Sequence, residues 1–311
     1  MCCLFGLLDY GNAFHGRDKS RIISVLSKEC EVRGTNATGI SYVCRDRLRV
    51  FKRPLPAHRM HFFLPAESPV IMGHTRMTTQ GCERYNPNNH PFEGRCGNTR
   101  FALAHNGILH NEAELRKKYR LPRTKIRTDS YVAVQLLEQQ GTLNLDSLKT
   151  MAEAVEGSFS FTLLDSENNL YFVKGNSPLC IYHFARQGFY LYASTEEILR
   201  VAVQKLRMDR LETERILPEC GEILKIDRKG EMETAVFDSS NLPMGWGFPH
   251  GLSWPEWRLQ ERGTDEYLRE LKSMAGYYGY APEDVDVMRA QGYSCGEIEE
   301  ILCGDDLLED F

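Results

Sequence analysis

The sequence has no long apolar run and no excess of basic residues. In its 311 residues, no apolar stretch approaches the roughly 20 residues that a membrane-spanning helix requires. Lysine and arginine number 38 against 43 acidic residues, whereas proteins that bind nucleic acids or membrane surfaces usually carry a basic excess. The N-terminus lacks a basic segment ahead of a long apolar stretch, and Asp9 interrupts it early. We therefore expect a cytoplasmic protein that binds neither nucleic acid nor membranes.

The sequence also lacks the cysteine spacings of disulfide frameworks and metal sites. Its ten cysteines are scattered, and no C-x-x-C pair occurs. Without a secretory signal, such cysteines indicate reduced thiols. Cys82, His90 and Cys96 are three candidate ligands, but their intervals are irregular for zinc. The sequence therefore predicts no metal site, and it indicates no organic cofactor.

Apolar runs of strand length are interspersed with helical patterns over the first 235 residues. Strands are expected at residues 4–8, 39–44, 70–72, 101–104, 158–164, 170–173, 179–183, 189–193 and 222–226. Helices are expected at residues 20–30, 112–119, 130–139, 145–155 and 196–203. No β-α-β repetition forces a parallel sheet, so the pattern predicts an α+β fold.

The composition changes near residue 236. All three tryptophans lie in the Gly/Pro-rich stretch 243–257, and three short helical patterns follow, beginning near Thr264, Pro282 and Ser294. We interpret residues 2–235 as one domain and residues 236–311 as an aromatic linker with a small acidic helical module. The module either packs on the first domain or serves partner docking or self-association.

Two adjacent cysteines follow Met1. Removal of Met1 would leave Cys2 with a free α-amine beside its own thiol. An α-amine titrates near pH 8 and a thiol near pH 8.5, so the amine can act as a general base for the thiol. The alternative interpretation of Cys2 is a buried cysteine of an N-terminal strand.

Three further segments each allow a structural and a functional interpretation. Arg76, in GHTRMTTQG (73–81), is either a surface ion-pair partner or a planar fork for a carboxylate. Asn106-Gly107, in AHNGILHN (104–111), is either a hairpin turn or an oxyanion hole made of a side-chain amide and a backbone N–H. Asp129, at the start of an expected helix, either caps that helix or holds an ammonium group.

Taken together and in this order, the motifs resemble those of the class II glutamine amidotransferase domain, an N-terminal-nucleophile hydrolase. Among its members the sequence most resembles the glutaminase domain of glucosamine-6-phosphate synthase. The matching motifs are Cys2-x-x-x-Gly6, EVRGTNATGISY (31–42), GHTRMTTQG (73–81), NNHPF (88–92), HNGILHN (105–111), TDSY (128–131), GNSPLCIY (175–182), YASTEEIL (192–199) and GEILKI (221–226). They cover about residues 2–235.

The resemblance implies a four-layer αββα sandwich that hydrolyses the side-chain amide of glutamine. It makes Cys2 the nucleophile, with its α-amine as the base, and gives Arg33 the task of positioning that residue. It implies that Asn106 and Gly107 stabilise the oxyanion on the way to and from a γ-glutamyl thioester. It assigns the α-carboxylate of glutamine to Arg76 and the α-ammonium to Asp129. Thr79 and Gln80 would line the glutamine pocket.

Four positions depart from the family pattern. Cys3 stands where glycine is usual, Met77 where tryptophan is usual, Gln80 where histidine is usual and Asn36 where aspartate is usual. These departures are compatible with hydrolysis and place channelled transfer of ammonia in question.

An acceptor domain is not recognisable in the sequence. Residues 236–311 are too few for sugar-phosphate isomerase domains, and neither an S-G-G-x-D-S loop nor a Walker loop occurs. We therefore expect a stand-alone glutaminase or amidotransferase subunit whose ammonia is taken by a separate synthase subunit, with homo-oligomerisation left open. The alternatives are an amidase for another γ-glutamyl compound and a catalytically silent binding relative.

Overall fold

The computed structural model describes residues 2–242 and 280–291, together with residues 268, 272, 275 and 298. The chain divides into two compact units, Met1–Gly245 and Trp246–Phe311. The boundary expected from composition, between residues 235 and 236, lies within the last strand of the first unit, β13 (Met232–Val236).

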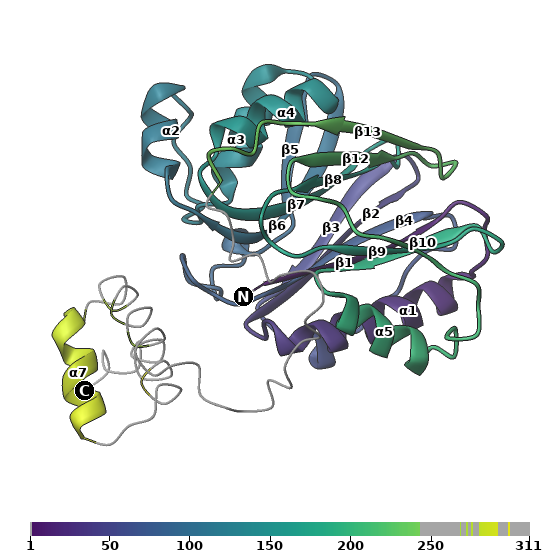
Figure 1. Cartoon of the computed structure of the whole chain (residues 1–311), viewed down its shortest axis with the longest axis horizontal. Helices are drawn as coiled ribbons and strands as arrows, with labels where there is room; N and C mark the ends of the chain where they lie inside the picture. The colour runs from purple at the N-terminus through teal and green to yellow at the C-terminus, as the bar shows by residue number, and fades with distance from the viewer. Residues whose placement is uncertain are drawn as a thin grey trace. The chain divides into compact units, whose positions relative to one another are not determined.

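The first unit contains two sheets in which all paired strands are antiparallel (Figure 1). The seven-stranded sheet has the order β11 (Glu214–Ile216), β9 (Cys180–Phe184), β10 (Phe189–Ala193), β1 (Cys3–Asp9), β4 (Val70–Arg76), β2 (Ala37–Cys44), β3 (Arg47–Arg53). The six-stranded sheet has the order β13 (Met232–Val236), β12 (Glu222–Ile226), β8 (Leu170–Lys174), β7 (Gly157–Asp165), β6 (Thr99–Leu109), β5 (Phe92–Cys96). The nine predicted strands are all present.

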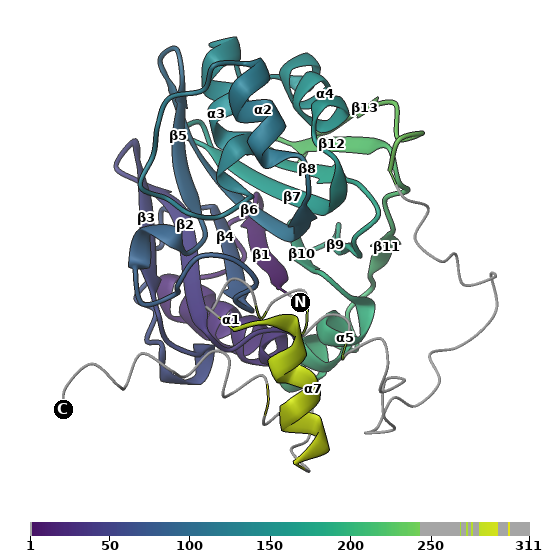
Figure 2. The same cartoon turned by 90° about the vertical axis from the view of Figure 1, so that its left-hand side faces the viewer.

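Helices cover the outer face of each sheet (Figures 1 and 2). Helices α1 (Gly16–Glu29) and α5 (Glu196–Lys205) pack on the seven-stranded sheet. Helices α3 (Tyr131–Gln140) and α4 (Leu145–Ala154) pack on the six-stranded sheet, and α2 (Glu112–Lys118) lies against α3. The layers therefore follow the order α, β, β, α, which confirms the predicted sandwich.

Strand β1 is buried on both faces because it lies in the middle of this sandwich. Cys3, Phe5 and Leu7 pack in the apolar cluster between the seven-stranded sheet and its helices. Leu4 and Leu8 alternate with them and pack in the cluster between the two sheets. This double burial explains why the N-terminal segment is apolar throughout instead of alternating with polar residues.

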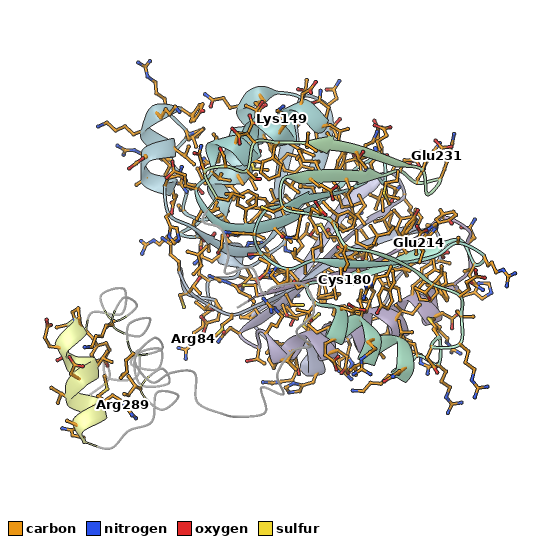
Figure 3. The ribbon with its side chains drawn as sticks, viewed as in Figure 1. Arg84, Lys149, Cys180, Glu214, Glu231 and Arg289 are labelled. Atoms are coloured by element: carbon orange, nitrogen blue, oxygen red, sulfur yellow. The ribbon has the colours of Figure 1, made fainter. Side chains whose placement is uncertain are left out.

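The described side chains divide in the expected way between interior and surface. Cys180 lies among packed side chains and is 1% exposed, whereas Lys149 and Glu231 lie on the outside of the unit (Figure 3). None of the helices in the described part of the chain is long and apolar enough to cross a membrane.

In the second unit, the helix predicted to begin at Pro282 is present as α7 (Pro282–Ala290). Its Val285 is buried in a small cluster with Ala275 and Ile298. The tryptophan-rich stretch 243–257 lies outside the described residues, as does most of the helical patterns expected near Thr264 and Ser294.

Candidate active site

Cys2 directly precedes β1 and is partly buried. Its Sγ lies 3.5 Å from the backbone oxygen of Met77, to which the thiol donates a hydrogen bond. The Nε of Arg33 donates to the backbone oxygen of Cys2 at 2.9 Å, so Arg33 fixes the position of this residue. Burial raises the pKa of the Cys2 thiol. The thiol is therefore protonated at neutral pH and needs a base before it can act as a nucleophile.

Cys3 has a different environment from Cys2. It is fully buried, and its Sγ lies 3.0 Å from the Sγ of Cys30. Cys30 is fully buried as well, so neither cysteine is exposed to a substrate.

Arg76 ends strand β4 and is only 3% exposed, so it is not a surface ion-pair partner. Its Nη1 donates to Oδ1 of Asn89 at 2.7 Å. Its Nη2 donates to the backbone oxygen of Gly81 at 2.7 Å and to that of Gln80. These neutral acceptors orient the guanidinium. Asn89 was not identified from the sequence, although it lies inside the NNHPF motif.

The loop after Arg76 is held at both ends. The backbone N–H of Thr78 donates to Oδ1 of Asn36 at 3.0 Å, so the asparagine that replaces the family's aspartate anchors the loop. Oε1 of Gln80 accepts the backbone N–H of Asp129 at 2.8 Å. Thr79 lies between these anchors and is partly buried. The two expected pocket residues therefore belong to a loop that is fixed against Asp129.

Asn106 and Gly107 lie inside strand β6, so the hairpin-turn interpretation is wrong. They pair with Ser160 and Phe159 of β7, and the strand continues to Leu109. Gly107 has a φ of +143°, and a Cβ added to it would lie 1.9 Å from the backbone oxygen of Ser158. Only glycine fits this position. This positive-φ backbone lies directly next to the buried side chain of Asn106.

Asp129 is 5% exposed and lies just before α3. Its Oδ2 accepts the backbone N–H of Leu109 at 2.6 Å, and its Oδ1 accepts the hydroxyl of Ser130 at 3.3 Å. The N-cap position of α3 is Ser130, so helix capping does not explain the carboxylate. Instead, Asp129 fixes the start of α3 to the end of β6.

These contacts bring together residues that are far apart in the sequence. The Cys2–Met77 contact joins the N-terminus to the Arg76 loop, and the Gln80–Asp129 contact joins that loop to α3. The Asp129–Leu109 bond then reaches β6 two residues beyond Gly107. Among the smaller influences on the pKa of Cys2, after burial, are a lowering by Arg76 and a raising by Asp129. The thiol, the cation and the anion therefore share one site.

Three buried histidines lie next to these residues and link the elements that carry them. His74, His90 and His105 are 1%, 4% and 1% exposed, and the rings of His74 and His90 lie 4.2 Å apart. His74 donates from Nε2 to the backbone oxygen of His105 at 2.9 Å, which links β4 to β6 across the two sheets. Nδ1 of His105 lies 2.8 Å from Oγ of Ser130. Burial lowers the pKa of His74 to about 3 and that of His90 well below its usual value. This cluster was not identified from the sequence, although each histidine lies in a quoted motif.

Comparison with known proteins gives concordant matches. A family model described as a glutamine amidotransferase domain matches residues 74–200. Glutamine–fructose-6-phosphate aminotransferase (isomerizing) from Staphylococcus aureus is 33% identical over 203 residues, which is 62% of this chain and 32% of the relative. The enzyme of the same name from Staphylococcus epidermidis is 32% identical over 203 residues, with the same coverage. The chain thus spans about a third of the length of these curated relatives.

Solved structures share the fold. Glutamine phosphoribosylpyrophosphate amidotransferase from B. subtilis, complexed with ADP and GMP, matches 76% of this chain and 49% of its own with a TM-score of 0.59. The sequence identity of that match is 21%. The stacked antiparallel sheets between helical layers place the first unit in the N-terminal-nucleophile hydrolase fold class. The family match and the staphylococcal relatives then define the domain further. Over residues 74–200 the chain thus matches a glutamine amidotransferase domain, which agrees with the class II resemblance of its motifs.

Proposed function

We propose that this chain hydrolyses the side-chain amide of glutamine to glutamate and ammonia through a γ-glutamyl thioester on Cys2. One observation carries the proposal. Within a glutamine amidotransferase domain, direct contacts connect the Cys2 thiol, the Arg76 loop and Asp129 into a single site next to Gly107. A nucleophile, a cation, an anion and an oxyanion clamp are the groups that amide hydrolysis of a zwitterionic amino acid requires.

Arg76 and Asp129 would hold the two charged ends of glutamine. The Arg76 guanidinium is oriented by Asn89 and by loop carbonyls, and its positive charge would attract the α-carboxylate. The Asp129 carboxylate would pair with the α-ammonium group. Both side chains are buried, so each interaction would be stronger than the same pair in water.

The reaction would begin after removal of Met1. The free α-amine of Cys2 takes the thiol proton, and the sulfur attacks the amide carbon of glutamine. Asn106 and the N–H of Gly107 stabilise the oxyanion. The ammonium group then returns the proton to the leaving nitrogen, which departs as ammonia. Water attacks the thioester through a second oxyanion, giving glutamate and the Cys2 thiol.

We propose further that the ammonia is passed to an acceptor held by a separate subunit, so that this chain is a stand-alone glutaminase component. Met77, whose backbone oxygen contacts Cys2, replaces the family's tryptophan. That replacement favours release of ammonia over internal channelling.

The test combines intact-mass measurement with a glutaminase assay on the full chain. We expect loss of Met1, a glutamyl adduct on Cys2 after acid quenching, and no activity in Cys2→Ala. Cys3→Ala is the matched control, because Cys3 is buried against Cys30 and lies outside the site. Activity in Cys2→Ala, or active protein that retains Met1, contradicts the mechanism. Faster hydrolysis of another γ-glutamyl amide than of glutamine contradicts the substrate assignment.

A further inference from the structure

Ser194 directly follows β10 and is fully buried at the junction of the two sheets. Its Oγ accepts the backbone N–H of Leu4 at 2.9 Å, and its own N–H donates to the backbone oxygen of Leu4 at 2.9 Å. The same Oγ accepts Nδ2 of Asn106 at 3.3 Å. One hydroxyl therefore contacts the strand that carries the nucleophile and the side chain proposed to bind the oxyanion.

The two hydrogen bonds that Ser194 accepts use the full acceptor capacity of its hydroxyl oxygen. A hydroxyl oxygen has two lone pairs, and Leu4 and Asn106 occupy both. Leu4 is two residues from Cys2 in the seven-stranded sheet, whereas Asn106 lies in β6 of the six-stranded sheet. Ser194 thus joins the two halves of the proposed site across the interface between the sheets.

In this arrangement the nitrogen end of the Asn106 amide faces Ser194. The side-chain amide of an asparagine can be turned by about 180°, which exchanges its donor and acceptor ends. The Ser194 oxygen accepts one N–H of Asn106, so the nitrogen end lies next to β1 and the second N–H remains for another acceptor. An oxyanion hole needs such a preorganised donor.

We propose that Ser194 is a positioning residue for the glutaminase reaction, holding the Asn106 amide in its donor orientation relative to Cys2. The inference rests on the proposed function. Ser194 does not touch the substrate, so its loss should affect the transition state more than the binding of glutamine. In Ser194→Ala we expect kcat to fall by about 10- to 100-fold and KM to change by less than about 3-fold.

Ser41→Ala is the matched control. Ser41 lies in β2 of the same sheet and is also fully buried, but its Oγ has no hydrogen-bond partner among the described residues. Ser41→Ala removes a buried hydroxyl without breaking a hydrogen bond, so kcat should stay within about 2-fold of the wild-type value. If Ser194→Ala and Ser41→Ala have the same kcat, the inference is wrong.

A double-mutant cycle tests whether Ser194 affects kcat through Asn106. Asn106→Ala alone should lower kcat by about 100- to 1,000-fold, and adding Ser194→Ala should lower it by much less than in the wild-type background. A full additional loss shows that Ser194 does not act through Asn106.

Amide hydrogen exchange tests the contact without any assay of activity. In Ser194→Ala the Leu4 N–H loses its acceptor, so it should exchange faster, whereas the Leu7 N–H in the same strand should not. Unchanged protection of Leu4 overturns the inference. Absence of glutaminase activity in the wild-type protein counts against the proposed function instead, so the two failures are distinguishable.

Discussion

The buried histidine cluster makes the stability of the first unit depend on pH. Burial lowers the pKa of His74 from 6.5 to about 3, so the folded protein keeps this ring neutral while the unfolded chain protonates it below about pH 6.5. The unfolded state then binds more protons than the folded state. The free energy of unfolding is therefore highest above pH 6.5 and decreases as the pH falls toward 3. For such a histidine, the free energy of unfolding is lower by about 1.4 kcal/mol at pH 5.5 than at neutral pH. His90, whose pKa is also far below its usual value, should double the loss to about 3 kcal/mol.

The assay is urea unfolding at about pH 7.5 and pH 5.5, followed by far-ultraviolet circular dichroism. Tryptophan fluorescence is unsuitable because all three tryptophans lie at residues 246–257, beyond the first unit. His74→Gln should be less stable at both pH values but should lose about 1.4 kcal/mol less on acidification. His58→Gln is the control, since the His58 side chain is 58% exposed and pairs with Glu31. Equal stability of the wild type at both pH values, or a pH dependence removed by His58→Gln, refutes the reasoning.

Two further substitutions test the geometry of the site. Gly107→Ala should destabilise the unit by about 3 kcal/mol or more and abolish glutaminase activity, because its Cβ would overlap the backbone oxygen of Ser158. Gly141→Ala, at φ +74° in open space, isolates the backbone cost and should lose only about 1 kcal/mol in urea unfolding; equal losses contradict the clash. Asn89→Ala removes the acceptor of Arg76 Nη1 and should raise KM for glutamine by roughly 10-fold with little change in kcat. An unchanged KM means that Asn89 does not orient the guanidinium.

The strands missed by sequence reasoning share one position in the fold. Four strands were not predicted, and they are the four sheet edges, β3, β5, β11 and β13. Strands β11 and β13 are largely exposed, and β3 carries arginine and lysine at four of its seven positions. An edge strand buries less apolar surface, and charged residues there discourage pairing with other chains. Apolar patterning therefore identified the interior of each sheet and could not identify its borders.

The site shows a different limit. Asn106-Gly107 has the local signature of a turn, and Asp129 has that of a helix cap. Each signature is overridden by a partner far away in the sequence: β7 pairs with Asn106, and Leu109 engages the Asp129 carboxylate. Local patterns could not decide between the interpretations because they carry no information on such distant contacts. Ser194 and the histidines were missed because their roles depend on contacts between the two sheets. Asn89 was missed because its role depends on its contact with Arg76.

The period of a strand bears on the choice between Cys2 and Cys3 as the proposed nucleophile. Side chains alternate between the faces of a sheet, and Cys3 shares the face of Phe5 and Leu7 toward the helices, where it meets Cys30. Continued back by one residue, the same alternation gives Cys2 the face of Leu4, between the two sheets. Asn106 lies on the sheet opposite that face, tied to Leu4 through Ser194. A nucleophile at position 3 would be directed into the helical layer, away from the second sheet. The chemistry of the chain terminus and the geometry of β1 therefore favour Cys2 independently.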